Sequence, residues 1–196
     1  MSPRTKTAFE ALRQKSKEAI QATALELFAH NGYHSTSISQ IAKEAGISKG
    51  LMYNYFTSKE ALLESIIMEA VEMGEKIMDE VLAADKSPLE MLIELTEASF
   101  QIVQGDLHYW KLMTSLAFQT DVLTSLEPLL KKQQEKAMQT VAALFSSMGA
   151  EKAEYKAWLY GAAMDGIMLH YMQMAPDYPL EQMKQLIIEQ FIQQSK

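Results

Sequence analysis

The sequence predicts an all-α protein, and three observations lead to that prediction. Apolar residues recur three and four positions apart over most of the 196 residues, which is the spacing of one helix face. Serine, threonine or proline opens several of these stretches, and glycine or proline follows them. No stretch after Ser58 alternates apolar and polar residues for long enough to form a sheet. We therefore expect about nine helices.

The stretch from Ser37 to Phe56 predicts two short helices joined by a glycine turn. Ser37 and Gln40 have the spacing of a capping box at the start of the first helix. Gly46 follows where a helix end favours a left-handed residue, and Ser48 can cap a second helix from Lys49. The apolar face of the first helix is formed by Ile38, Ile41, Ala42 and Ala45. A break this short is typical of a helix-turn-helix.

The second of these helices carries an unusual set of side chains on its outer face. Met52 and Phe56 continue the inner face begun by Ile47. The outer face then holds Lys49, Gly50, Leu51, Tyr53 and Asn54. Leucine can pack on a thymine methyl group, lysine and tyrosine can bind phosphates, and asparagine can bind a base edge. Glycine costs about 1 kcal/mol of helix propensity relative to alanine, but it lets a helix backbone approach DNA closely. The pattern predicts a helix that enters the major groove.

A helix from about Ser16 to Asn31 precedes this stretch and is expected to brace it. Gly32 ends that helix, whose apolar face is Ile20, Ala24, Leu27 and Phe28. Two interpretations fit the basic segment at the chain start: an arm that reaches phosphates or a minor groove, or a solvated, disordered tail. Its basic residues are Arg4, Lys6, Arg13, Lys15 and Lys17.

An ordered pattern runs from about Ile20 to Leu63: LF..NGY, then TS...IA..AGISKG, then Y.YF..KE.L. This pattern resembles the N-terminal domain of the TetR family of bacterial repressors. Two positions depart from it. Tyr55 stands where the family often has histidine, and Met52 stands where it often has leucine. Both changes are compatible with an apolar environment, so they affect the packing detail and leave the motif intact.

The resemblance implies a repressor that acts as a homodimer on a palindromic DNA operator. Each subunit would insert the helix from Lys49 to Tyr55 into the major groove. In the family, the next helix joins this domain to the body of the protein. Here a capping box at Thr57 and Glu60 opens that helix, which runs to about Leu82. Phosphate contacts are expected from Thr36, Ser37, Lys49, Tyr53 and Lys59, and base contacts from Gly50, Leu51 and Asn54.

Five further helices are expected in the rest of the chain. Ser87, Pro88 and Glu90 mark the start of one that runs to about Gln104. The others are expected at about 107–122, 127–148, 151–173 and 180–194. We expect residues 1–57 to form the helix-turn-helix DNA-binding domain with its N-terminal arm. Residues 58–196 would then form a helical effector-binding and dimerisation domain.

The resemblance also places an effector cavity and a dimer interface in this second domain. Ligand contacts are expected from Phe100, Tyr109, Trp110, Met113, Phe118, Met164 and His170. The 14 methionines supply adaptable apolar surface, although each one singly also fits an ordinary core position. A four-helix interface across a two-fold axis is expected from the last two helices, with core packing within one chain as the alternative. Its candidate residues are Gly161, Ala162, Gly166, Met183, Ile187 and Phe191.

Charge is divided unevenly along the chain. The formal net charge is −7, which by itself would disfavour a DNA-binding protein. Residues 1–60, however, carry eight Lys and Arg against five Glu, whereas residues 61–196 carry ten against twenty acidic residues. The asymmetry indicates a DNA-facing end followed by an acidic remainder.

Composition and motifs argue against several other classes of protein. Because the chain has no cysteine, it has neither a disulfide framework nor a thiolate metal site. No apolar run approaches the roughly 20 residues that span a bilayer, so we expect a cytoplasmic protein with no membrane partner. No phosphate-binding loop, His-x-x-x-His pair or nucleophile elbow occurs. We therefore expect no catalytic residues, no cofactor and no metal site.

These observations predict a ligand-responsive transcriptional regulator, and repression is the mode that the resemblance implies. Its partners would be double-stranded operator DNA, a small apolar or aromatic effector and a second copy of the chain. The alternative is a helical dimer that binds small molecules or acts as an adaptor and no longer recognises specific DNA.

Overall fold

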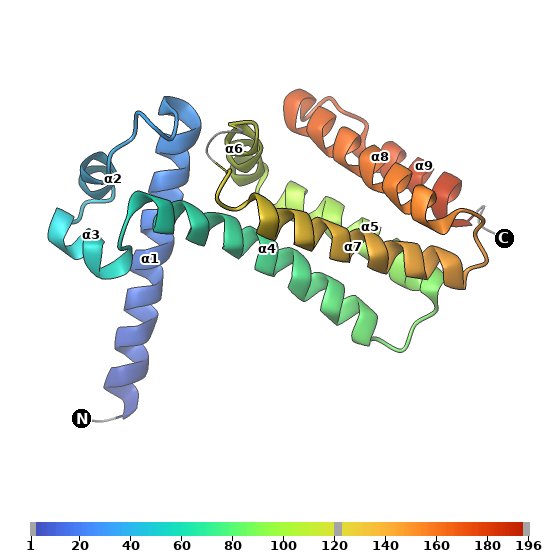
Figure 1. Ribbon diagram of the computed structural model, residues 1–196, viewed down its shortest axis with the longest axis horizontal. Helices are drawn as coiled ribbons and strands as arrows, with labels where there is room; N and C mark the ends of the chain where they lie inside the picture. Colours follow the sequence, from blue (N-terminus) through green and yellow to red (C-terminus); the bar gives the residue numbers. More distant parts are fainter. Residues whose placement is uncertain (1–2, 120–122, 194–196) are drawn as a thin grey trace. The chain divides into compact units, whose positions relative to one another are not determined.

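The computed structural model describes residues 3–119 and 123–193, and this part of the chain is helical throughout (Figure 1). It contains nine α-helices and one π-helical turn, with no strand among the described residues. The predicted fold class is confirmed. The elements are α1 (Pro3–Asn31), α2 (Ile38–Glu44), α3 (Lys49–Tyr55), α4 (Lys59–Ala83), α5 (Pro88–Gly105), α6 (Leu107–Ala117), α7 (Glu127–Ser147), α8 (Ala153–Met174), α9 (Leu180–Ile187) and η1 (Ile188–Gln193).

The chain packs as two compact units. The first, called the head here, consists of Met1–Val71 and Leu112–Thr124, and the second, called the body, consists of Glu72–Lys111 and Ser125–Lys196. Two of the three crossings between the units therefore fall inside helices, one in α4 and one in α6. The sequence analysis assigned DNA binding to residues 1–57, and effector binding and dimerisation to residues 58–196. These roles stay a prediction.

Local capping signals determine the short helices of the head. Ser37 accepts a hydrogen bond from the Gln40 amide while Gln40 accepts one from the Ser37 amide, so the predicted capping box is present. Gly46 has a φ of +69° directly after α2, and Ser48 caps α3 through the Leu51 amide. The inner faces of α2 and α3 bury Ile41 and Met52, and α1 and α4 add buried side chains that include Phe28 and Leu62. Their burial stabilises the three-helix arrangement that was predicted.

Several boundaries differ from the sequence prediction, and α9 followed by η1 stands where a single helix was predicted at 180–194. Helix α1 begins at Pro3 instead of Ser16, because no glycine or further proline interrupts the helix-forming residues after Pro3. Helix α4 is capped by Ser58, whose hydroxyl accepts from the Ala61 amide, so the predicted cap at Thr57 is one residue too early. Helix α6 ends at Ala117, and its predicted end at Val122 lies outside the described residues.

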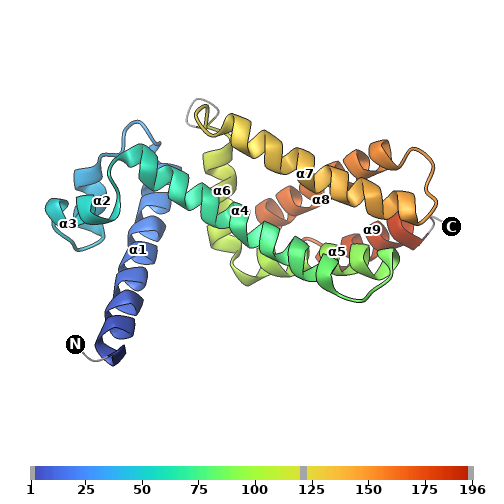
Figure 2. The same ribbon diagram turned by 60° about the horizontal axis from the view of Figure 1, so that its bottom comes forward.

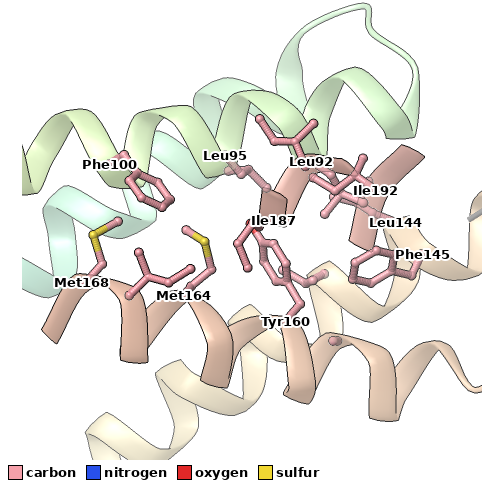
Figure 3. Close-up of a cluster of buried hydrophobic side chains, with 14 of the residues drawn as sticks. Leu92, Leu95, Phe100, Leu144, Phe145, Tyr160, Met164, Met168, Ile187 and Ile192 are labelled. Atoms are coloured by element: carbon pink, nitrogen blue, oxygen red, sulfur yellow. The ribbon is translucent and has the colours of Figure 1, made fainter. Parts of the chain in front are cut away.

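The body is a bundle built mainly from α5, α7, α8 and α9, which run side by side in both views (Figures 1 and 2). The predicted capping box of Ser87 and Glu90 opens α5. Buried side chains from all four helices and from η1 point toward one another in the centre of this bundle (Figure 3). One buried polar pair belongs to this core: the Thr96 and Tyr160 hydroxyls are 2.8 Å apart. Since Thr96 donates to the Leu92 carbonyl at 2.7 Å, Tyr160 is the donor of the pair.

Candidate DNA-binding site

Helix α3 divides its side chains between the core and solvent. Met52 and Phe56, the residue that caps α3, are 0% and 4% exposed and anchor the helix to the head. Leu51 and Tyr53 are 41% and 47% exposed, although both are large and partly or wholly apolar. The other exposed residues of the helix are Lys49, Gly50 and Asn54. The exposed face therefore holds the five residues that the sequence assigned to it, and their contact with DNA stays a prediction.

Gly50 has no conformational or packing reason to be glycine within this chain. It lies in a helix, and a Cβ atom built on it would meet nothing within 4 Å. Alanine there would favour the helix by about 1 kcal/mol. The chain thus keeps a less stable residue in the first turn of its exposed helix face. A macromolecule that approaches the α3 backbone from outside would explain that choice.

Two of the expected phosphate-binding residues have roles inside the head. Thr36 is only 2% exposed, and its hydroxyl donates to the Gly32 carbonyl at 2.9 Å. Ser37 is exposed, but its hydroxyl accepts the Gln40 amide at 3.2 Å as the cap of α2. The Ser37 hydroxyl keeps its own proton for an outside acceptor, whereas the Thr36 hydroxyl does not.

Lys59 is also held by the head. Its ammonium group donates to the carbonyls of Tyr33 at 2.8 Å and Thr36 at 2.9 Å. It also lies over the Tyr33 ring, 4.3 Å from the centroid. The start of α4 is thereby fixed to the turn that connects α1 and α2. Sequence reasoning placed Lys59 beside DNA and missed this bracing role, because no local pattern connects residues 26 positions apart.

The Tyr33 side chain strengthens the same junction. It is buried, packs edge-on against Phe28, and donates its hydroxyl to the Glu60 carboxylate at 3.2 Å. Burial, followed by the charge of Glu60, raises the pKa of Tyr33 to about 12. The Tyr33 hydroxyl therefore stays a donor at neutral pH. Hydrogen bonds from its own backbone amide and from the Ser58 hydroxyl lower the pKa of Glu60, so its carboxylate stays an acceptor.

Arg13 is a residue of this site whose contact the sequence did not reveal. Its guanidinium donates to the Asn54 carbonyl at 3.4 Å and lies 5.8 Å from the centroid of the Tyr55 ring. Both partners belong to the last turn of α3, where backbone carbonyls lack helical partners and a positive charge is favourable. Arg13 therefore supports the end of α3 from α1. The sequence showed Arg13 only as one of five basic residues near the chain start.

The residues expected to bind a ligand are distributed over both units. Phe100 and Met164 belong to the buried core of the body, and Trp110 packs against that core (Figure 3). Met113 and Phe118 belong to the head, where Met113 is buried and Phe118 is 72% exposed. Tyr109 and His170 belong to the body; Tyr109 contacts Trp110 edge-on, and His170 contacts Tyr178 in the same way.

Several residues expected at a dimer interface have partners within the chain. A Cβ atom on Gly161 would lie 3.3 Å from the sulfur of Met138. Ile187 is 5% exposed in the body core, and the Phe191 ring packs edge-on against Tyr160. Ala162 is exposed, while Gly166 and Met183 are half-buried. The role of all six in dimerisation stays a prediction.

The described residues contain neither a cluster that could bind a metal ion nor a helix that could span a membrane. No three His, Asp or Glu side chains in this part of the chain gather into a set that could hold a metal ion. None of the helices in the same residues is both long and apolar enough to cross a bilayer.

Comparison with known proteins finds a family likeness in the head. Residues 20–66, which include the whole of α2 and α3, match the model of the bacterial regulatory proteins of the tetR family. In this segment the chain is similar to the TetR family. The match begins in α1 and ends in α4, so it also contains the Tyr33–Lys59 junction.

Two relatives and one solved structure illustrate the likeness. Over 56 residues the chain is 57% identical to the HTH-type transcriptional regulator YuxN of Bacillus subtilis, covering 29% of this chain and 19% of that protein. Over 104 residues it is 35% identical to the fatty acid metabolism regulator protein of the same bacterium, covering 53% of each. The chain thus spans about half or less of the length of these relatives, both of which are regulators.

The fold likeness extends over nearly the whole chain. The crystal structure of the transcriptional regulator FadR from Bacillus subtilis, in complex with stearoyl-CoA, matches with a TM-score of 0.71 at 21% identity. The match covers 89% of this chain and 97% of that one. At this identity the likeness establishes the helical fold of both units.

Lys59→Met tests whether this lysine braces the head. Removal of the ammonium leaves the Thr36 carbonyl without its donor, and we expect a loss of about 2 kcal/mol because hydrogen bonds to charged groups are worth about 1.5–3 kcal/mol. The measurement is native-state hydrogen exchange of α2 and α3 in the full chain. Lys43→Met, an exposed change on α2, is the control. An unchanged free energy of opening in Lys59→Met would contradict the bracing role, and phosphate binding would then be the role expected of Lys59.

Proposed function

We propose that this protein is a ligand-responsive transcriptional repressor that binds a palindromic operator as a homodimer. The observation that supports the proposal most strongly is the exposed face of α3, which carries the large side chains of Leu51 and Tyr53 and a glycine that the head does not need. Leu51, Tyr53 and Asn54 would lie along the major groove, with Lys49 at the N-terminal end of the helix against a phosphate. Repression follows when the operator overlaps a promoter.

A single α3 helix is too short to select one operator in a genome. Its seven residues can contact only a few base pairs, and each correct base contact contributes about 1–3 kcal/mol of discrimination. A two-fold dimer doubles this contact and requires a palindromic site. The proposed function therefore depends on a second copy of the chain.

Helix α8 offers the surface for that second copy. Tyr155, Trp158 and Leu159 are 74%, 44% and 62% exposed, and with Ala162 they follow the i, i+3, i+4, i+7 spacing of one helix face. The opposite side of α8 packs into the body core through Tyr160, Met164 and Met168, among others. Leu186 of α9, at 47% exposed, adds to the apolar surface. An exposed apolar stripe of this length is typical of a protein interface.

The body is proposed to bind the effector. Its core is rich in methionine and aromatic side chains, including Phe100, Met164 and Met168 (Figure 3), and such side chains repack around varied apolar ligands. The names of the relatives make long-chain acyl compounds the first class to test. If the effector favours a state with low DNA affinity, operator DNA must weaken effector binding by the same factor.

The alternative function is a helical dimer that no longer recognises DNA sequence and serves as a binding or adaptor module. Both functions use the body and the exposed apolar stripe on α8. The two differ in the head, where the adaptor function gives no reason for an exposed leucine and a glycine in the first turn of α3.

Lys49→Ala tests the phosphate contact of α3. Loss of one phosphate contact per subunit should weaken binding to every DNA sequence and reduce the slope of log K against log salt by about one for each bound subunit. The measurement is fluorescence anisotropy with a duplex of mixed sequence between about 50 and 200 mM salt. Lys131→Ala, an exposed change on α7 of the body, is the control. A slope equal to that of the unchanged protein would remove Lys49 from the phosphate contacts.

Gly50→Ala separates the effect of this residue on the stability of the head from its effect on DNA affinity. Alanine should raise the stability of the head by about 0.4–1 kcal/mol, because it meets nothing in the chain and restricts the unfolded state. The same methyl group should lower DNA affinity at least about tenfold, since a loss of 1.4 kcal/mol is sufficient for that factor. Gly74→Ala in α4 is matched, with equally open space, and should stabilise without changing DNA affinity. Equal DNA affinity for both variants would contradict the docking of α3.

A further inference from the structure

The positive charge of the head is concentrated in the first half of α1. Residues 3–17 carry five Lys and Arg against one Glu, which gives this segment a net charge of +4. Residues 18–60, which contain α2 and α3, carry three Lys against four Glu and have a net charge of −1. The positive excess of the first 60 residues therefore belongs to the start of α1, and the helix-turn-helix has no excess of its own.

Few cations of the helix-turn-helix segment are available to an outside partner. Lys59 is one of its three lysines, and the Tyr33 and Thr36 carbonyls hold its ammonium group. The other two lysines, Lys43 and Lys49, are exposed. Contacts to phosphates supply most of the affinity in non-specific DNA binding and a large share of it in specific binding. A head that binds DNA therefore needs further cations, and the start of α1 carries them.

The N-terminal part of α1 continues past α3 as an unbroken helix (Figures 1 and 2). The basic segment is thus helical from Pro3, whereas the sequence suggested an arm or a disordered tail. The contact of the Arg13 guanidinium with the Asn54 carbonyl marks where α1 passes the last turn of α3. From Pro3 to Arg13 the helix rises by about 15 Å at 1.5 Å per residue. A major groove is roughly 12 Å wide, so this length is sufficient to reach a phosphate strand at its edge.

The side of α1 that meets α3 carries both cationic and apolar groups. Phe9 and Lys17 lie four residues before and after Arg13, so the three share one face of the helix. Phe9 is 67% exposed, Arg13 is exposed and Lys17 is half-buried. Because an arginine has five N–H donors, Arg13 keeps donors for a phosphate beside its bond to the Asn54 carbonyl. Lys15 is also exposed, but a spacing of two residues places it on the opposite face.

We propose that this face of α1, formed by Phe9, Arg13 and Lys17, is a second DNA-binding surface of the head. It contacts the phosphate strand beside the groove that α3 enters, with the two cations on phosphates and the phenyl ring against the sugars. The inference rests on the proposed function, because it adds a contact to the same DNA complex.

Charge complementarity selects DNA as the occupant of this surface. The acidic body of a second copy is the other anionic partner that the chain itself offers, and residues 61–196 have a net charge of −10. Double-stranded DNA carries one negative charge per roughly 1.7 Å of helix axis, which is a denser and more regular array. A helix with cations four residues apart on one face fits that array better than it fits scattered carboxylates.

Arg13→Gln is the first test, because glutamine can still donate to the Asn54 carbonyl but carries no charge. We expect the slope of log K against log salt to fall by about one for each bound subunit, measured by fluorescence anisotropy on a mixed-sequence duplex. Lys15→Gln is the matched control, since it removes the same charge from the opposite face of the same helix and should leave the slope unchanged. Equal slopes for the two variants would overturn the proposal.

Arg13→Lys separates phosphate binding from support of α3. Lysine keeps the positive charge but loses the planar guanidinium that lies by the Tyr55 ring. The salt slope of Arg13→Lys should therefore equal that of the unchanged protein. A slope as low as that of Arg13→Gln would show that Arg13 acts only by holding α3, and the proposal would be wrong.

Sedimentation velocity of the same variants tests the other occupant. If Arg13→Gln weakens self-association and leaves the salt slope unchanged, the face binds a second copy of the chain and the proposal is overturned. Failure of the unchanged protein to bind any duplex would contradict the proposed function and this inference with it. Binding by the unchanged protein, with equal slopes for Arg13→Gln and Lys15→Gln, would contradict the α1 surface alone.

Discussion

The turn between α1 and α2 satisfies only some of its own backbone groups, and side chains distant in the sequence bind the turn as well. Lys59 binds two of its carbonyls, and Gln119 binds the amide and the carbonyl at its α1 end. Unpaired buried backbone groups are costly, so this arrangement is strongly favoured over one in which α4 or α6 moves away. The geometry of the head thus depends on side chains that come from outside α2 and α3.

Contacts within the head also hold helix α3 in place. With Met52 and Phe56 anchored in the core and Arg13 binding the last turn, the helix is held firmly while its other face stays open. Exposed Leu51 and Tyr53 offer little benefit to an isolated head, and Gly50 reduces its stability. These features fit a helix that docks into a DNA groove, where apolar contact and close backbone approach are both favourable.

Sequence reasoning succeeded where the determining interactions are local. The capping boxes of Ser37 with Gln40 and of Ser87 with Glu90 join residues three apart, so the pattern alone revealed them. The face of α3 followed from helical periodicity for the same reason. The braces at Lys59 and Gln119 join residues 26 and 86 positions apart, and no periodicity encodes such pairs. The inward hydroxyl of Thr36 was missed for a different reason. Its partner Gly32 is only four residues away, but a threonine beside a cap looks the same in the sequence whether it faces solvent or the core.

Under the proposed function, α3 recognises DNA as one half of a two-fold dimer. Selection from a pool of random duplexes with the purified chain, followed by sequencing, tests this recognition. We expect enrichment of an inverted repeat whose half-sites are about one helical turn apart, or a multiple of that distance. Recovery of no enriched sequence, or of a single half-site without its repeat, would contradict it.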